Sequence, residues 1–152
     1  MKKTFKMYYF PYSKIMLMIF LSIFLTCTCA KEDPWKRLNE QAASLYQQGH
    51  YAEGAKVAEE ALGVAERTFG PDHPNVATSL NDLALLYYSQ GKYAEAEPLY
   101  KRSLKIAEKA LGPDHPNVAA VLENMAKCCR EMGKKDEAEK LEARAKKIRN
   151  KR

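Results

Sequence analysis

One stretch of eight residues, Gly-Pro-Asp-His-Pro-Asn-Val-Ala, occurs twice in this chain, first from Gly70 to Ala77 and again from Gly112 to Ala119. The two copies begin 42 residues apart. Self-similarity at a fixed period of about 20–50 residues is the sequence signature of a repeat array, in which each unit packs mainly on its neighbours. We therefore expect a fold built by stacking similar units.

The segment between the two copies has the pattern of two helices joined by a tight turn. Apolar residues recur at three- and four-residue spacing on either side of Gly91, which places them on one face of each helix. Pro74 stands where a first-turn proline is tolerated, because its missing N–H would have no partner there. The apolar residues before the turn are Leu80, Leu83, Ala84, Tyr87 and Tyr88, and those after it are Tyr93, Ala96, Leu99, Tyr100, Leu104, Ala107 and Leu111.

The same pattern continues in both directions. Trp35, Leu38 and Ala42 open a first unit that turns at Gly49, and Val118 opens a third unit that turns at Gly133. Terminal units of an array have no outer neighbour, so we expect charge at their uncovered positions, such as Lys135 and Glu142 in place of tyrosines. The expected order is a short entry at residues 31–34, repeats at about 35–70, 74–112 and 116–150, and a basic tail at 151–152.

The complete unit resembles the tetratricopeptide repeat, in the longer variety found in kinesin light chains. This resemblance implies an all-α fold, a short right-handed solenoid of about three helix-turn-helix repeats, preceded here by an N-terminal signal segment. It also implies a module that binds other proteins or peptides in a concave groove. The residues that carry it are Leu80, Leu83, Ala84, Tyr87, Gly91, Tyr93, Ala96, Tyr100 and Ser103, together with the Gly-Pro-Asp-His-Pro loop.

Residues 1–30 have the layout of an export signal. A lysine-bearing start precedes the apolar run 15–25, which is shorter than the ~20 residues of a transmembrane helix. Cleavage after Ala30 is one outcome. Lipidation of Cys27 as in a bacterial lipoprotein, or retention as an uncleaved anchor, are the others. All three predict an exported chain, in the periplasm or on the outer face of a membrane if the source is bacterial.

The basic balance of the chain does not indicate a nucleic-acid partner. The net charge is +6, but Lys2, Lys3, Lys6 and Lys14 lie in the first thirty residues, which contain no acid. Without those four lysines the charge is about +2, too small for a basic binding surface. We expect membrane contact only through the N-terminal signal or a lipid anchor. The basic run 144–152 is interpreted as a solvated helix end, or alternatively as a patch for anionic lipid or an acidic partner.

No residue pattern indicates catalysis, a metal site or a cofactor. His73 and His115 lie one repeat apart, or ~10 Å, which is too far to share a metal ion. We expect Asp72 and Asp114 beside them to cap the following helices. Cys128 and Cys129 are adjacent on a predicted helix and are interpreted as small buried hydrophobes, with a strained vicinal disulfide as the alternative.

Binding is therefore expected on the first helix of each pair, at positions away from the packing stripe. The resemblance implies that these positions hold an extended peptide, with Asn81 bonding its backbone, tyrosines supplying flat apolar area, and Lys127 with Arg130 favouring acidic guests. The alternative at each position is a solvated surface. The candidate groove residues are Asn39, Tyr46, Thr78, Asn81, Leu85, Tyr88, Glu123, Lys127 and Arg130.

These observations predict a non-catalytic protein-protein interaction module that is exported to the cell envelope and binds a peptide or protein partner in its groove. The alternative is a structural subunit that stacks on itself or docks into a larger assembly through its exposed end helices. A homo-oligomer is possible under that alternative, because a short array leaves apolar surface at both ends.

Overall fold

The computed structural model describes residues 33–151, and within them every regular element is a helix. The expected signal segment, with Cys27 and the site after Ala30, lies outside the described residues. Six helices follow one another along the chain: α2 (Pro34–Gln47), α3 (Tyr51–Phe69), α4 (Pro74–Ser89), α5 (Tyr93–Leu111), α6 (Pro116–Glu131) and α7 (Lys135–Arg149). Among residues 33–151, none of the helices combines the length and the apolar character that a membrane crossing requires.

The helices form three pairs, each joined by a tight turn around a glycine. Gly49, Gly91 and Gly133 have φ values of 78°, 76° and 77°, in the left-handed region where a side chain is disfavoured. In each turn the N–H of the following residue donates to a carbonyl near the end of the first helix, as Lys92 N does to Tyr87 O at 2.9 Å. This bond satisfies one carbonyl at the helix end. The predicted helix-turn-helix units are therefore confirmed.

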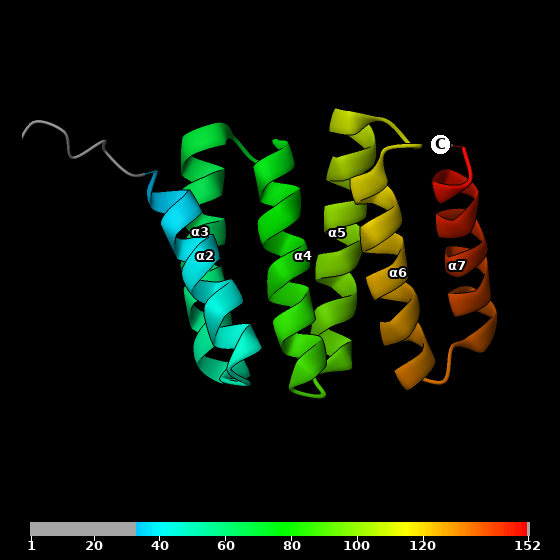
Figure 1. Cartoon of the computed structure of the whole chain (residues 1–152), viewed down its shortest axis with the longest axis horizontal. Coiled ribbons are helices and arrows are strands. Elements are labelled where there is room, and N and C mark those ends of the chain that lie inside the picture. The colour runs from blue at the N-terminus through cyan, green and yellow to red at the C-terminus, as the bar shows by residue number, and fades with distance from the viewer. Residues whose placement is uncertain (1–32, 152) are drawn as a thin grey trace, which may run out of the picture. The chain divides into compact units, whose positions relative to one another are not determined.

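The first helix of each pair approaches the first helix of the next pair. Cα atoms of α2 and α4 come within 8 Å of each other, as do those of α4 and α6, whereas no Cα atom of α3 comes that close to α5, or α5 to α7. The helices stand side by side in chain order (Figure 1). The array is therefore narrower on the side of α2, α4 and α6, which is called the inner face below.

On the other side, ion pairs between long side chains link neighbouring repeats. Arg102 of α5 pairs with Glu66 of α3, and Arg144 of α7 pairs with Glu108 of α5, both at 2.6 Å. The two pairs are equivalent under the 42-residue shift. Arg144 and Arg149 belong to the basic run at the chain end, and both are in ion pairs with the preceding helices. Much of the positive charge of that run is therefore neutralised by carboxylates of the array itself.

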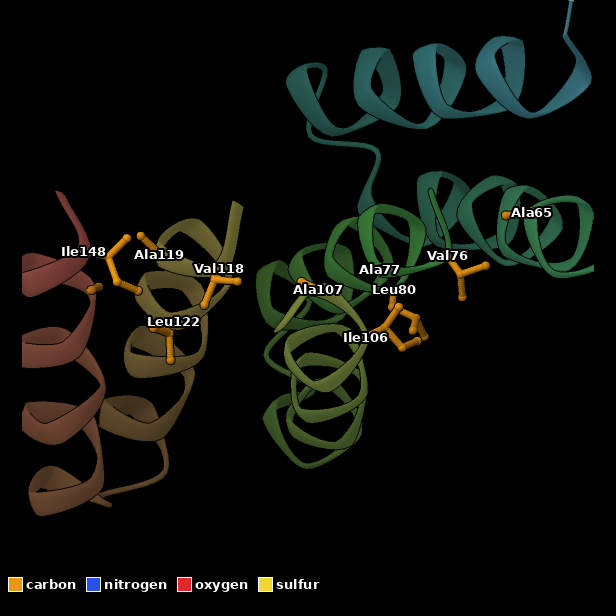
Figure 2. Packing of buried hydrophobic residues seen from close by; sticks show 11 residues of the cluster. Ala65, Val76, Ala77, Leu80, Ile106, Ala107, Val118, Ala119, Leu122 and Ile148 are labelled. Carbon is orange, nitrogen blue, oxygen red and sulfur yellow. The ribbon is translucent and has the colours of Figure 1, made fainter. Parts of the chain in front are cut away.

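The buried hydrophobic side chains of residues 33–151 form clusters that lie between the helices. Figure 2 shows one cluster, whose labelled side chains come from helices α3 to α7, among them Leu80 on α4, Leu122 on α6 and Ile148 on α7. Small residues on α3 allow close approach to its neighbours, since Gly54, Ala58 and Ala61 are all buried. Tyr100, at 0% exposure, is the largest fully buried side chain among the residues that the structure describes.

The helix starts at the two loop copies differ from the expectation. His73 and His115, not the aspartates before them, are the N-cap residues, and each Nδ1 accepts the backbone N–H two residues ahead at 3.1 Å. Asp72 instead accepts from Lys109, and Asp114 from Lys151 at 2.5 Å. The ion pairs lower the pKa of both carboxyl groups. The prediction that the aspartates cap these helices was therefore wrong, because each carboxylate faces a lysine of the next repeat unit.

The adjacent cysteines behave as the simpler interpretation predicts. Cys128 and Cys129 are both fully buried on α6, and both thiols are free. Burial raises the pKa of Cys128 to about 11 and also raises that of Cys129. Thiols held in their neutral form are poor nucleophiles and poor metal ligands. They act here as small apolar packing groups.

Candidate binding groove

The inner face contains two open hollows, one at each junction between neighbouring first helices. The hollow between α2 and α4 has a volume of about 230 Å³, and the one between α4 and α6 about 210 Å³. The first, called the Asp82 hollow, is lined by Ala42, Ala43, Tyr46, Gln47, Asp82, Leu85 and Leu86. The second, called the Asn81 hollow, is lined on the inner helices by Pro74, Ala77, Thr78, Asn81, Asn117, Ala120 and Val121, and on α5 by Ser103, Ala107 and Leu111.

Four of the nine predicted groove residues line these hollows. Tyr46 and Leu85 belong to the Asp82 hollow, and Thr78 and Asn81 belong to the Asn81 hollow. Thr78 is exposed and Leu85 is half-buried, so both can touch a guest. Both hollows are smaller than the roughly 300–1,000 Å³ of typical small-molecule sites. They therefore suit single side chains of an extended segment better than a compact ligand.

The amide of Asn81 is partly used inside the protein. Its Nδ2 donates to Asp82 at 3.2 Å, and its Oδ1 accepts from Asn124 Nδ2 of the next repeat at 3.1 Å. One N–H and one oxygen lone pair are left over from these two bonds. Asn81 thus links α4 to α6, and its expected role toward a guest's backbone stays a prediction.

The two groove tyrosines are each paired with another tyrosine across a repeat turn. The ring centroids of Tyr46 and Tyr51 are 5.5 Å apart, and those of Tyr88 and Tyr93 are 5.4 Å apart, with interplanar angles of 52°. Burial raises the pKa of Tyr88, whose hydroxyl stays neutral. Tyr46 lines a hollow, whereas Tyr88 packs beside Tyr93 outside both described hollows.

The three residues predicted on α6 lie near the end of the array. Arg130 makes a bidentate pair with Glu142 at 2.8 and 2.6 Å, and Glu123 makes one with Arg149 at 2.5 and 2.7 Å. Both pairs join α6 to α7. Lys127 is exposed, and Asn39 on α2 is half-buried outside the two hollows. Arg130 is already engaged with Glu142. Of the two cations predicted to attract an acidic guest, only Lys127 is left for that role.

Sequence reasoning missed the most distinctive group of the inner face, Asp82. Burial raises the pKa of this carboxyl, and the hydrogen bond from Asn81 offsets only part of that effect. Within residues 33–151 it makes no ion pair, and Asn81 provides its only side-chain hydrogen bond. A signal was available, because Asp82 is the single charged residue in α4.

The described part of the chain contains no cluster of three or more His, Cys, Asp or Glu residues that could hold a metal ion. The described histidines are N-cap residues, and the cysteines are buried thiols. The arrangement of residues 33–151 therefore offers side-chain-sized hollows and hydrogen-bonding groups on an inner face.

A sequence profile for the tetratricopeptide repeat matches residues 37–109 and again residues 86–151. The chain belongs to the tetratricopeptide repeat family. Its 42-residue period and its structural neighbours place it with the kinesin-light-chain-like type, as the sequence predicted. Proteins of this family commonly bind protein partners through their repeats. No curated protein sequence matches the chain.

Solved structures of other tetratricopeptide repeats have the same fold. The nearly identical TPR-like repeats of a Podosopora anserina protein assigned as a kinesin light chain are 26% identical, with a TM-score of 0.71 over 79% of this chain. This chain spans 58% of that one. The TPR domain of Arabidopsis FLU is 16% identical, with a TM-score of 0.71 over 80% of this chain and 99% of that domain. BtubC (BKLC) from P. vanneervenii is 19% identical, with a TM-score of 0.56 over 91% of this chain and 73% of its own length.

Proposed function

We propose that this tetratricopeptide repeat chain is a non-catalytic interaction module that binds an extended peptide segment of a partner protein along its inner face. The observation that carries the proposal is the pair of hollows at successive helix junctions. They are open, each is large enough for one side chain, and α4 borders both. An extended segment crossing α4 would place side chains in both hollows. Family membership supports the same conclusion.

The alternative, self-stacking through the end helices, has weaker support from the described surface. The hollow on the α2–α3 end contains Leu38 and Val64, but four charged residues surround them. At the other end Lys135 and much of α7 are exposed and charged. Interfaces between identical subunits are more apolar than the general protein surface. The charged ends of this array do not have that character.

Two arginine substitutions test the groove. Thr78→Arg and Leu85→Arg place a long charged side chain in the Asn81 hollow and the Asp82 hollow, respectively. We expect each to reduce capture from an immobilised library of nine-residue peptides by about tenfold or more, because a filled hollow excludes the guest's side chain. Fluorescence of the captured protein measures the effect, and the melting temperature is recorded for each variant.

Ala110→Arg is the matched control, because Ala110 is exposed on α5, outside both hollows. Its capture should equal that of the parent. Equal capture by all three variants would contradict binding on the inner face, and a mass that rises with concentration in sedimentation would favour self-stacking instead.

We also propose that the chain is exported, with its repeats outside the cytoplasm. The support is the sequence of residues 1–30, in which a lysine-bearing start precedes a short apolar run and small residues. Mass spectrometry of the mature protein from a bacterial host is expected to show cleavage after Ala30. A lipid-bearing Cys27 would make it a lipoprotein. An intact N-terminus on protein recovered from the cytoplasm would contradict export.

A further inference from the structure

We propose that the Asp82 hollow is a subsite for a lysine or arginine side chain of the bound segment. The inference rests on the proposed function and adds a chemical class of guest to it. It is carried by one partly buried carboxylate that has no cationic partner among residues 33–151, set in a small hollow whose other walls are mainly apolar.

The charge of the hollow is uncompensated. Asp82 is the only charged residue between Pro74 and Ser89, and no lysine, arginine or histidine of residues 33–151 pairs with it. The groups beside it in the hollow, Tyr46 and Gln47, are neutral. A carboxylate that loses water without gaining a counter-charge is costly. A cationic guest would remove that cost, whereas an acidic guest would add a second negative charge.

The walls of the hollow match the stem of such a guest. Ala43 and Leu85 are apolar, and Tyr46 lines the same hollow. Lysine and arginine carry three or four methylene groups below the charged head, and they bury this stem along apolar surface while the head bonds an acceptor. A cation near a tyrosine face gains further attraction. The volume of about 230 Å³ suits one side chain and not a larger ligand.

Asn124 occupies in the next repeat the position that Asp82 occupies in the middle one, and the comparison shows how the carboxylate alters the junction between inner helices. Asn124 stands 42 residues after Asp82, and its Nδ2 donates to Asn81 Oδ1 at 3.1 Å, joining α6 to α4. An ionised carboxylate at position 82 has no N–H to donate, so this bond has no counterpart between Asp82 and Asn39 of α2. The two junctions of the inner face therefore differ in one functional group. At one junction an amide bridges the two inner helices, and at the other the carboxylate of Asp82 accepts only from Asn81 among residues 33–151.

The direct test uses n-butylammonium, which carries the charged head and a short stem of lysine, with n-butanol as the neutral probe. Titration of the full chain at neutral pH is followed by the backbone NMR signals of Tyr46, Asp82 and Leu85. We expect n-butylammonium to shift these signals at concentrations at which n-butanol does not. Asp82→Asn should weaken the binding by about tenfold or more, since the negative charge that attracts the ammonium group is lost while only a neutral acceptor remains.

Asp82→Asn is also the matched structural control, because it reproduces the amide that Asn124 supplies one repeat later. Its melting temperature should equal or exceed that of the parent. A folded carboxyl with a raised pKa loses stability as the pH rises through that pKa, so its neutral replacement removes a destabilising charge. Weaker binding together with unchanged or higher stability would support the subsite. Equal binding of n-butylammonium by parent and variant would overturn it.

Peptide capture separates this inference from the proposed function. Libraries that differ only in a central lysine, norleucine or glutamate are compared on the parent and on Asp82→Asn. Preference for lysine that disappears in the variant would support the subsite. Capture without that preference would overturn the subsite and leave groove binding intact, whereas no capture by any library would overturn both.

The experiment also distinguishes a partner's side chain from a lysine of this same chain as the occupant of the Asp82 hollow. If replacing Lys2, Lys3, Lys6 and Lys14 with alanine moved the signals of the hollow, and n-butylammonium bound only after that change, the guest would be this chain's own N-terminal segment. That outcome would overturn a partner's side chain as the occupant.

Discussion

Replacing Tyr100 with alanine is expected to lower the free energy of unfolding by about 3–5 kcal/mol. Tyr100 is fully buried on α5, in a cluster with Ala84 of α4, Met125 of α6 and Ala138 of α7. Truncation would leave a large cavity where two repeats meet, and the surrounding helices can close only part of it. Urea unfolding measures the change, followed by the circular dichroism signal at 222 nm, which is strongly negative for helices. A small array has a total stability of only about 5–15 kcal/mol, so the variant could be mostly unfolded at 37 °C.

Tyr87→Ala is the comparison for this prediction. The sequence pattern treats the two tyrosines alike, but Tyr87 is only half-buried and its hydroxyl donates to Glu59 at 2.5 Å near the surface. This bond, with burial, raises the pKa of Tyr87 to about 12, so the donor is retained at neutral pH. We expect a loss of about 1–2 kcal/mol for this variant. Equal losses for the two variants, or none for Tyr100→Ala, would contradict the packing described here.

Replacing Gly54 with valine should cost about 1–3 kcal/mol, the usual range for overpacking. Gly54 lies on α3 where α2 and α4 approach. A Cβ atom there would stand 2.8 Å from Leu86 Cδ2 and 3.4 Å from Leu45 Cβ. Leu86 is itself buried at 2% exposure and has little room to move. The added side chain would push α2 and α4 away from α3. We therefore expect a lower urea concentration at the midpoint of unfolding.

Gly63 provides the control on the same helix. A Cβ at this position would meet only the flexible side chain of Arg67, at 3.3 Å. Gly63→Ala should therefore raise the free energy of unfolding by about 0.5–1 kcal/mol, because alanine has less backbone freedom to lose in a helix. Opposite signs for the two glycines would show that steric approach, and not helix propensity, decides the effect at Gly54. A stabilising Gly54→Val would contradict the close approach.

Asp82 and Arg130 show how far electrostatic preference could be predicted. The sequence predicts that Lys127 and Arg130 make the inner face attractive to acidic segments. The bidentate bond between Arg130 and Glu142 engages one of these cations, and Asp82 adds an anion that has no cationic partner in residues 33–151. The sign of charge on a surface depends on which charges neutralise each other. Repeat spacing alone does not contain that information.

The same limit applies to the helix caps. Asp72 is a good N-cap residue by type, and its place in the loop suggested that role. The ring of His73, stacked on Phe69 with centroids 4.8 Å apart, holds the cap position instead, while Asp72 reaches Lys109. The lysine that binds the Asp72 carboxylate lies 37 positions further along the chain. Local sequence around the loop therefore does not show that His73, and not Asp72, caps the helix.

The period, the helix pairs and the turn glycines could all be predicted from the amino-acid order. They depend on backbone conformation and on apolar spacing within a few residues, and the 42-residue recurrence repeats the same local signal. The hollows of the inner face, the bond between Asn81 and Asn124, and the lack of a cation beside Asp82 within the described part of the chain became visible only when the helices were assembled. These features arise between repeats, where the distance between two side chains depends on how one helix packs against the next.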